Sequence, residues 1–535
     1  MAAERRRISR RGFTGWALGT TAGLMASPWI GAGPLPGRSP GDGLPRNRPE
    51  AHGVDPRAIL AFLDETRAAG LELHSFMLAR GGDVIAEGWW SPYRADRAHM
   101  MHSLTKSVAV SGVALALQEN LFGIDDKVVS FFPDELPPVV SENLAAMTVR
   151  DLLTMRAGHD AEISGSVWRQ VRTSWVTEFF KVPVPLKPGS RFVYSSAVSF
   201  MLSAIVTKVT GQKLRDYMEP RFFAPLGIAG LSWDVGPGGI NPGGNGLTWK
   251  TADALKLGML YAQRGRWQGS QILAPEWVDA ATRPQVEEGE YGYQWWIGPN
   301  RAYYALGLFT QMSIVFPDHD AVLAVTAAID GSEQFTSIVW KHFPAAFGAG
   351  RAPHHGKSFA ALASRVKTLS VQPQLATGSS PAARRVSGRV YRATTNADGI
   401  EDFTFTFSGD RCHFTMRDGR GTHAVEVGVG RWVEGRTSMT GNKLHHQYQP
   451  DSMLVVAGGQ WVAPDTFEMT WQFAETAFTE SLGWMTGVAV YVTFQLAFNS
   501  GFVDTTQISK PPLAAERSGA AGVVAAGAVD RKSVV

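Results

Sequence analysis

The hydrophobic periodicity of this chain changes at about residue 387, and this change constrains the fold more than any other feature. Between about 51 and 345, helix-period segments such as 103–118 alternate with strand-like runs such as 313–327. Beyond residue 387, apolar residues alternate with polar ones, as in 403–407, which reads Phe-Thr-Phe-Thr-Phe. That alternation is typical of a half-buried strand. The chain therefore predicts an α+β domain followed by an all-β, barrel-like domain.

Composition refines the domain limits of the 535-residue chain, whose length suits two or three domains. We predict a first domain over 51–345 and the β-rich domain over 386–505. Residues 346–385 are small, polar and basic, which indicates a connector. Residues 34–50 are rich in Pro and Gly and indicate a linker. The final segment, 506–535, lacks periodicity and is predicted to be a disordered tail.

Residues 1–33 have the pattern of an export signal. The Ser-Arg-Arg-Gly-Phe sequence at 9–13 resembles the twin-arginine motif, and a moderately apolar stretch follows it. That stretch contains too many Gly, Thr and Pro to predict a membrane span. Because twin-arginine signals are receptor-read addresses, we expect a periplasmic or secreted protein with no stable membrane span in the mature chain. The alternative interpretation is a basic, disordered N-terminus.

The charge balance argues against a nucleic-acid-binding protein, and the cysteine content excludes a disulfide within the chain. The net charge is +3, but residues 1–11 hold five Arg and one Glu, which leaves 46 basic against 47 acidic side chains elsewhere. Without a basic surplus we expect no nucleic-acid partner. The single cysteine, Cys412, cannot form a disulfide within the chain. We expect it to be a small core residue rather than a nucleophile.

Residues 103–106 read Ser-Leu-Thr-Lys and match the pattern Ser-x-x-Lys. Residues three apart lie on one helix face, so the Lys106 amine can lie beside the Ser103 hydroxyl. Serine needs a neighbouring base to become a nucleophile, and a buried lysine can lose its proton and supply it. The pattern alone is weak, because Ser364 and Lys367 match it too. The alternative interpretation is a helix N-cap beside a solvated lysine.

Two further elements strengthen the hypothesis. Residues 194–196 read Tyr-Ser-Ser before an apolar helical run, and Tyr194 can shuttle a proton between serine and leaving group. Residues 303–311 read as a strand, a glycine-containing turn and a second strand. A backbone N–H near Leu308 can pair with that of Ser103 to bind an oxyanion. The alternative interpretation of Tyr194 alone is a core tyrosine, and that of 303–311 alone is an ordinary hairpin.

The order of these three elements resembles the serine β-lactamase-related family. That family includes class C β-lactamases, D-stereospecific peptidases, carboxylesterases and 6-aminohexanoate-dimer hydrolases. The resemblance covers about 51–345 and extends to framework segments at 123–128, 148–155, 225–228 and 291–296. It implies a β-lactamase/transpeptidase-like domain, with an antiparallel sheet flanked by helices beside a helical lobe. It also implies a covalent acyl-enzyme, with Ser103 as nucleophile, Lys106 as base and Tyr194 as proton relay.

Two departures from the family pattern bear on the substrate. The family's Asn after the tyrosine is replaced by Ser196, which has no amide donor for the substrate. The Lys-Thr-Gly of β-lactamases is replaced by Ala-Leu-Gly at 305–307, so no cation awaits a substrate carboxylate. Both disfavour an efficient β-lactamase and favour an esterase or amidase for a small acyl group. Ser196, Gly307 and Leu308 are the predicted substrate-binding or oxyanion positions.

The sequence thus predicts a serine hydrolase acting on a small ester or amide. The alternatives are a penicillin-interactive DD-peptidase or β-lactamase, and a catalytically silent binding protein of the same fold. No Gly-x-Ser-x-Gly elbow is indicated, because the match at 37–41 lies in the predicted linker and not between a strand and a helix. The histidine pairs at 354–355 and 445–446 lack metal-ligand helical spacing, and no His-Glu-x-x-His or nucleotide-binding glycine pattern occurs. We therefore expect no metal and no cofactor. The region 386–505 resembles the lipocalin-like modules that follow some family members; substrate identity and oligomeric state stay open.

Overall fold

The computed structural model describes residues 41–163, 171–286, 290–348, 356–393, 400–439, 452–486, 490–498, 517–518 and 521–524. The predicted export signal, 1–33, lies outside these residues. Of the predicted linker, 34–50, the last ten residues are described, and Arg46 there donates to Glu87 at 3.0 Å. This contact holds the segment against the first domain.

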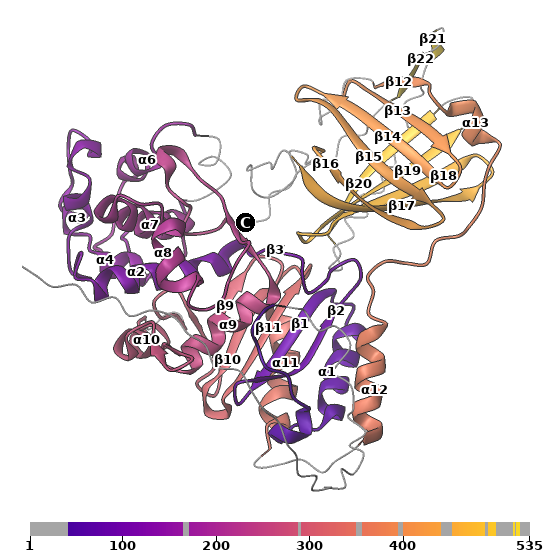
Figure 1. Ribbon diagram of the computed structural model, residues 1–535. Helices are drawn as coiled ribbons and strands as arrows, with labels where there is room; N and C mark the ends of the chain where they lie inside the picture. The colour runs from indigo at the N-terminus through magenta and orange to yellow at the C-terminus, as the bar shows by residue number, and fades with distance from the viewer. Residues whose placement is uncertain are drawn as a thin grey trace, which may run out of the picture. The chain divides into compact units, whose positions relative to one another are not determined.

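A six-stranded antiparallel sheet forms the centre of the first domain (Figure 1), with the strand order β2-β1-β11-β10-β9-β8. Its strands are β1 (Leu73–Arg80), β2 (Asp83–Trp89), β8 (Trp296–Ile297), β9 (Tyr303–Gly307), β10 (Gln311–Phe316) and β11 (Ala321–Ala327). Every residue of β10 and β11 is buried. Because successive side chains point to opposite faces, both faces of the sheet must be covered.

One face of the sheet packs on α1 (Pro56–Ala68) and α11 (Glu333–Ala346), with which it shares a hydrophobic core. The start of α1 has a Pro in its first turn and the Asp55 side chain as N-cap, as helix starts favour. A further helix, α12 (Gly356–Lys367), falls inside the predicted connector 346–385. Its buried Leu362 belongs to the same core, which explains why a helix forms in so polar a segment.

The opposite face packs on α9 (Thr251–Ala262), which lies unusually close to the sheet. Gly258 permits this approach, since a Cβ there would lie 2.5 Å from Val322 and 2.6 Å from Ser313. The Ser313 hydroxyl also donates to the Ala254 carbonyl at 2.8 Å. Sheet and helix are therefore joined by close packing and a hydrogen bond.

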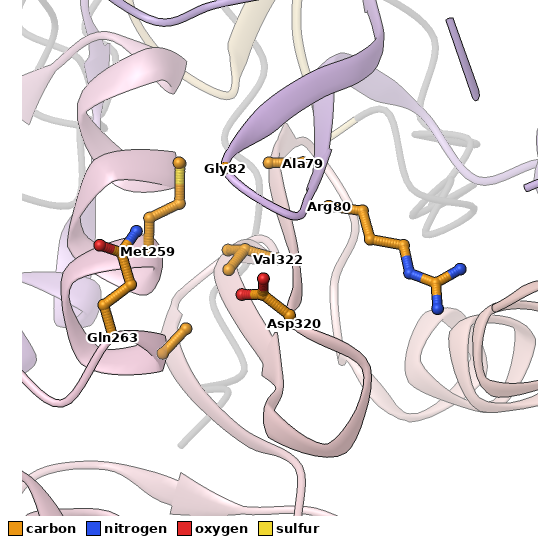
Figure 2. Close-up of a pocket in the computed structure, with 8 residues that line it drawn as sticks. Ala79, Arg80, Gly82, Met259, Gln263, Asp320 and Val322 are labelled. Atoms are coloured by element: carbon orange, nitrogen blue, oxygen red, sulfur yellow. The ribbon is translucent and has the colours of Figure 1, made fainter. Parts of the chain in front are cut away.

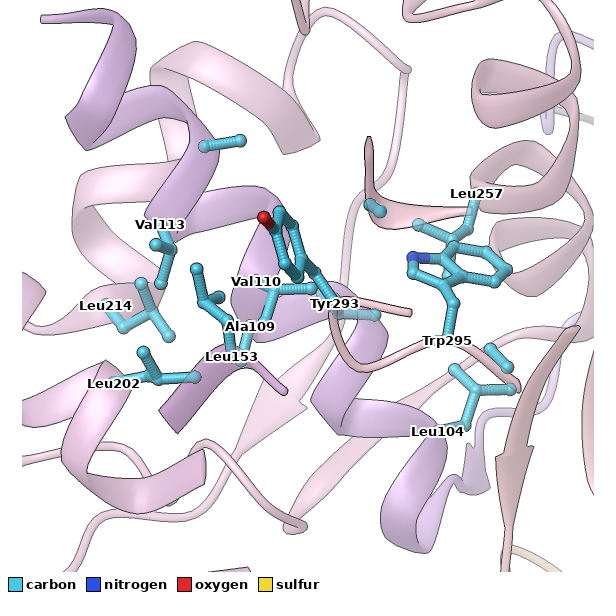
Figure 3. Packing of buried hydrophobic residues seen from close by; sticks show 14 of the residues in the cluster. Leu104, Ala109, Val110, Val113, Leu153, Leu202, Leu214, Leu257, Tyr293 and Trp295 are labelled. Carbon is cyan, nitrogen blue, oxygen red and sulfur yellow. The ribbon is translucent and has the colours of Figure 1, made fainter. Parts of the chain in front are cut away.

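A helical lobe lies beside the sheet and contains α2 (Thr105–Gln118), α3 (Glu142–Ala146), α4 (Val149–Leu153), α6 (Trp175–Lys181), α7 (Ser196–Thr210), α8 (Leu214–Met218) and α10 (Pro275–Ala281). Residues 105–116 of α2 are all buried, so this helix runs through the core rather than over the surface. Figure 3 shows its Val110 and Val113 among Leu153, Leu202 and Leu214 of neighbouring helices. The predicted β-lactamase-like fold, a sheet flanked by helices beside a helical lobe, is confirmed.

The C-terminal region forms a separate sheet domain with the strand order β20-β19-β18-β17-β15-β14-β13-β12-β22-β21, and β16 pairs with β17. The bounds are β12 (Val390–Ala393), β13 (Asp402–Ser408), β14 (Arg411–Asp418), β15 (Gly421–Val429), β16 (Trp432–Thr437), β17 (Met453–Ala463), β18 (Thr466–Phe473), β19 (Phe478–Thr486), β20 (Val490–Phe498), β21 (Arg517–Ser518) and β22 (Ala521–Val524). The predicted period-two strands are confirmed, because Cys412, Phe414 and Met416 are buried and the residues between them are not.

Two features of this domain bear on the predictions. No strand ladder among the described residues joins the two ends of the sheet, so a closed barrel stays a prediction. Strands β21 and β22 fall within 506–535, the segment predicted to be a disordered tail, and β22 pairs with β12. In the part of the chain that the structure describes, no helix is long and apolar enough to span a membrane.

The close approach of α9 predicts the effect of enlarging Gly258. We expect Gly258→Ala to destabilise the protein by about 1–3 kcal/mol, because the added methyl forces the helix off Val322 and Ser313. The midpoint of urea unfolding measures this change. Gly378→Ala is the matched control, since a Cβ there meets nothing within 4 Å. Equal midpoints for both variants would contradict the packing described here.

The position of Cys412 predicts its reactivity. Burial raises the pKa of the Cys412 thiol, so the thiolate that reacts with disulfide reagents is not formed near neutral pH. We expect a chromogenic disulfide reagent to leave the folded protein unmodified at pH 8 and to modify one thiol per chain in guanidinium. Rapid modification of the folded protein would place Cys412 at the surface instead.

Candidate active site

Ser103 lies on a short 3-10 turn, η2 (His102–Leu104), between β3 (His99–Met100) and α2. The preceding residue, His102, has a φ of 50°, an uncommon left-handed conformation for a residue other than glycine. Ser103 itself is half-buried, whereas the rest of the turn is buried. The strained turn therefore presents the serine side chain at the start of the central helix.

The Lys106 side chain is the centre of the site. Its amine lies 2.9 Å from Ser103 Oγ and 2.9 Å from Ser196 Oγ. It also donates to the Gly244 carbonyl at 3.1 Å. Only 1% of the Lys106 surface is exposed, so these partners replace water around the amine. The predicted adjacency of Ser103 and Lys106 on one helix face is present.

The second Ser-x-x-Lys sequence has a different environment. Ser364 and Lys367 lie near the end of α12, and both are exposed. The same four-residue pattern thus occurs once in the core of the domain and once on its surface. Burial of the lysine, not the pattern, distinguishes the two.

Gly244 is a site residue that the sequence reasoning did not find. It belongs to the segment 241–246, which reads Asn-Pro-Gly-Gly-Asn-Gly and follows the helical lobe. A Cβ at Gly243 would overlap the Ser199 carbonyl, and a Cβ at Gly244 would lie 2.8 Å from Ser196 Cβ. The segment can therefore lie flat on the start of α7 and bring a carbonyl to Lys106. The adjacent glycines were the available signal, since such runs mark close backbone approach.

Ser196, the first residue of α7, lies beside Lys106, and its hydroxyl contacts the Lys106 amine. Its use in binding substrate or an oxyanion stays a prediction. The side chain is also covered by the Gly244 backbone, which lies against it.

Tyr194 is half-buried beside these groups. The Lys106 amine lies 4.6 Å from the centroid of its ring, and the Trp296 ring stacks on it at 5.6 Å. Burial raises the pKa of Tyr194, a hydrogen bond with Ser103 opposes this rise, and the negative charge of Glu162 adds to it. The net direction is upward, so the phenol stays protonated at neutral pH and can donate a proton rather than accept one.

The end of β9 runs directly beside the serine turn. A Cβ at Gly307 would overlap the Met101 carbonyl and lie 3.1 Å from Leu104 N, so only glycine fits there. Leu308 follows, with 37% of its side chain exposed. The structure therefore brings the backbone of Gly307 and Leu308 to the backbone around Ser103. Two N–H groups on such facing segments can form an oxyanion hole.

Gln294 supports the site from behind and was also missed from sequence. Its backbone carbonyl accepts from the Ser107 hydroxyl of α2 at 2.6 Å, and its side-chain Oε1 accepts from the Ser199 hydroxyl of α7 at 2.7 Å. Its amide donates to the Leu152 carbonyl of α4 at 3.1 Å. The Gln294 backbone carbonyl thus binds α2, and the buried Gln294 side chain joins α4 to α7, the helix that begins at Ser196.

A small cavity elsewhere in the domain does not belong to this site. Figure 2 shows it at the β1–β2 turn, where it is lined by Ala79, Arg80, Gly82, Met259, Ala262, Gln263, Asp320 and Val322. Its volume of about 10 Å³ suits at most one water molecule. Among the described residues, no group of three or more His, Cys, Asp or Glu side chains is placed to hold a metal ion.

Known proteins similar to this chain include three curated hydrolases. The 6-aminohexanoate-dimer hydrolase of Paenarthrobacter ureafaciens is 22% identical over 278 residues, 46% of this chain and 71% of that protein. The lovastatin esterase of Penicillium rubens is 24% identical over 172 residues, 28% of this chain and 43% of that protein. A putative D-alanyl-D-alanine carboxypeptidase of Escherichia coli K12 is 25% identical over 160 residues, 28% and 36% of the two chains. The chain spans less than half of the last two.

Among solved structures, a putative 6-aminohexanoate-dimer hydrolase from Bacillus anthracis aligns with 61% of this chain and 88% of its own, at 17% identity and a TM-score of 0.46. The family model described as Beta-lactamase matches residues 57–341, which is more than half of the chain and includes every residue of the site described above. The chain therefore belongs to the beta-lactamase family of hydrolases.

Proposed function

We propose that this protein is a serine hydrolase that cleaves a small ester or amide through a covalent acyl-enzyme on Ser103. The observation that carries the proposal is the buried Lys106 amine, 2.9 Å from the Ser103 hydroxyl. A nucleophile and a base within hydrogen-bond reach, with the base held by further groups, is the arrangement that activates a serine.

In the first step, neutral Lys106 takes the Ser103 proton as Oγ attacks the carbonyl carbon of the substrate. The resulting ammonium has three N–H groups, and the Ser196 hydroxyl and the Gly244 carbonyl are in place to accept two of them. Because the site is buried, these acceptors stabilise the charge where water cannot. They support lysine as the group that holds the proton during acylation.

The remaining steps use the groups around this pair. The N–H groups of Ser103 and Leu308 stabilise the oxyanion of the tetrahedral intermediate. Tyr194, whose phenol burial keeps protonated, donates a proton to the leaving group as the ester or amide bond breaks. The Tyr194 phenolate that remains takes a proton from the water that attacks the acyl-enzyme. As the bond between the acyl group and Ser103 Oγ breaks, the Lys106 ammonium returns its proton to Oγ, and the acid product leaves.

The surroundings favour an uncharged acyl group. Residues 305–307 read Ala-Leu-Gly, so this strand offers no cation to a substrate carboxylate. The exposed Leu308 side chain and the Tyr194–Trp296 stack supply apolar surface instead. The similar proteins named 6-aminohexanoate-dimer hydrolase and lovastatin esterase support a linear amide or an ester as the substrate class.

A DD-peptidase is the second candidate, because one similar protein is named a putative D-alanyl-D-alanine carboxypeptidase. The missing cation at 305–307 disfavours it. Turnover of a chromogenic cephalosporin faster than that of a chromogenic ester would favour this candidate. We also propose export by the twin-arginine route, on the strength of the sequence at 9–13.

The proposal predicts which serine reacts with a fluorophosphonate probe. We expect one probe per chain by intact mass, no labelling of Ser103→Ala, and full labelling of Ser364→Ala. The last variant is the matched control, because Ser364 heads the second Ser-x-x-Lys sequence but is exposed. Labelling that survives in Ser103→Ala places the nucleophile elsewhere, and a folded protein that does not label at all supports the silent binding protein.

The assignment of Tyr194 predicts a dependence on the leaving group. Tyr194→Phe keeps the ring against Trp296 but removes the proton donor. We expect kcat/KM to fall at least about 10²-fold for an alkyl ester, whose alkoxide needs a proton. Hydrolysis of a p-nitrophenyl ester, whose leaving group departs as a stable anion, should change far less. Equal losses for the two substrates would show that Tyr194 does not act as the acid.

A further inference from the structure

We propose that Gln311 is a positioning residue that holds the oxyanion-binding turn in its active shape. The turn comprises residues 308–310 and joins β9 to β10. The inference deepens the proposed function, on which it rests, by naming the group that keeps the Leu308 N–H beside Ser103.

The turn is strained. Phe309 has a φ of 60° and Thr310 a φ of 64°, so two consecutive residues other than glycine adopt the left-handed conformation. For a β-branched residue such as threonine this conformation is a genuine outlier. Such strain persists only where the surroundings fix the backbone, and it gathers at functional sites.

Gln311 supplies the groups that fix it. Its side chain is completely buried, and its amide nitrogen lies 3.1 Å from the Leu308 carbonyl and 3.0 Å from the Phe309 carbonyl. The same nitrogen lies 2.8 Å from the Ala327 carbonyl, and the side-chain oxygen accepts from Ala327 N at 3.1 Å. The two N–H groups of the Gln311 amide are therefore shared among two carbonyls of the turn and the Ala327 carbonyl at the end of β11.

A second set of bonds closes the turn from the other side. The Thr310 hydroxyl donates to the Ile329 carbonyl at 3.1 Å, and Ile329 N donates to the Phe309 carbonyl at 3.3 Å. Rotation of the Phe309–Thr310 peptide plane would break bonds in both sets, and rotation of the Leu308–Phe309 plane would break the bond to Gln311. The conformation is thus fixed by the Gln311 side chain at the start of β10, by the Thr310 hydroxyl and by the backbone of Ala327 and Ile329.

The shape of the turn reaches the nucleophile by two contacts. At its start, Gly307 lies against the Met101 carbonyl, and this approach carries the next N–H, that of Leu308, to the serine turn. At its centre, the Phe309 ring packs edge-on against His102, with ring centroids 5.5 Å apart. His102 is the left-handed residue directly before Ser103. Both N–H donors of the oxyanion hole therefore depend on one turn.

The chemistry of the position requires glutamine. Three carbonyl oxygens and one N–H face the side chain, so it must supply donors and an acceptor without a charge. Glutamate offers only acceptors when ionised and would repel the carbonyls. Methionine has a similar length but supplies no donor.

Gln311→Met tests the inference with two substrates that differ in one atom. An ester and its thionoester analogue need the same nucleophile and base, but a thiocarbonyl sulfur accepts N–H bonds poorly. We expect the acylation rate of the ester to fall about 10–100-fold and that of the thionoester less than threefold, because the oxyanion donors are displaced. Gln263→Met, at an exposed glutamine, should leave both rates unchanged. Equal losses for both substrates, or no loss, overturn the proposal.

Rescue separates positioning from a general packing defect. Asparagine tolerates the left-handed conformation better than threonine and keeps a side-chain donor for the Ile329 carbonyl, so Thr310→Asn added to Gln311→Met should restore the ester rate at least several-fold. If Gln311→Met does not fold, Gln311→Glu replaces it. Its carboxyl regains one donor on protonation, so the ester-to-thionoester rate ratio should rise as pH falls. A ratio that does not change with pH, or a double variant no faster than Gln311→Met, contradicts the positioning role.

Fluorophosphonate labelling of the wild-type protein distinguishes failure of this inference from failure of the proposed function. If wild-type Ser103 does not label, the proposed function fails and this inference falls with it. If Ser103 labels and Gln311→Met lowers the ester and thionoester rates alike, only the role of Gln311 is wrong.

Discussion

The rest of the domain depends on one constraint: the Lys106 amine is buried at the start of the apolar helix α2. An amine without partners at that depth would strongly oppose folding. Lys106 has partners from three separate segments: Ser103 on the 3-10 turn before α2, Ser196 at the start of α7, and the Gly244 carbonyl. Each segment must therefore be brought close, which explains the left-handed turn before Ser103, the close packing of α2 and α7, and the glycines that flatten the 243–246 segment.

The same constraint gives the site its chemistry. The helical lobe supplies Lys106 and its partners, while the edge of the sheet supplies the backbone of Gly307 and Leu308 beside the serine turn. In the proposed mechanism, positive charge develops on Lys106 and negative charge on the oxyanion, and buried groups preorganise both places. Gln294 fixes the helices on one side, and Gln311 fixes the strained turn on the other. Two buried glutamines, neither close to Ser103 in sequence, thus support the two halves of the site.

The contacts and burial patterns that depend on local backbone geometry could be predicted from the sequence. The adjacency of Ser103 and Lys106 follows from helix periodicity, and the alternating burial around Cys412 follows from strand periodicity. Gly244 was marked only by the glycines beside it, and its partner Lys106 lies far along the chain. Gln311 contacts the nearby Leu308 and Phe309, but its burial and its bonds to Ala327 emerge only from tertiary structure. The helix α12 was missed because its packing rests on Leu362, in a segment that is otherwise polar and small. Ser196 was identified as a site residue, but its partner, Lys106, emerges only from tertiary structure.

In the proposed mechanism, turnover passes through an acyl group on Ser103, and trapping this acyl-enzyme is the direct test of the mechanism. The protein would be mixed with a chromogenic ester, quenched with acid during turnover, and digested with trypsin. Cleavage after Arg97 and Lys106 isolates residues 98–106, in which Ser103 is the only serine. The account predicts the mass of the acyl group on this peptide, with a burst of leaving group of matching size. Turnover with no acylated peptide, or with the acyl group on another peptide, would contradict it.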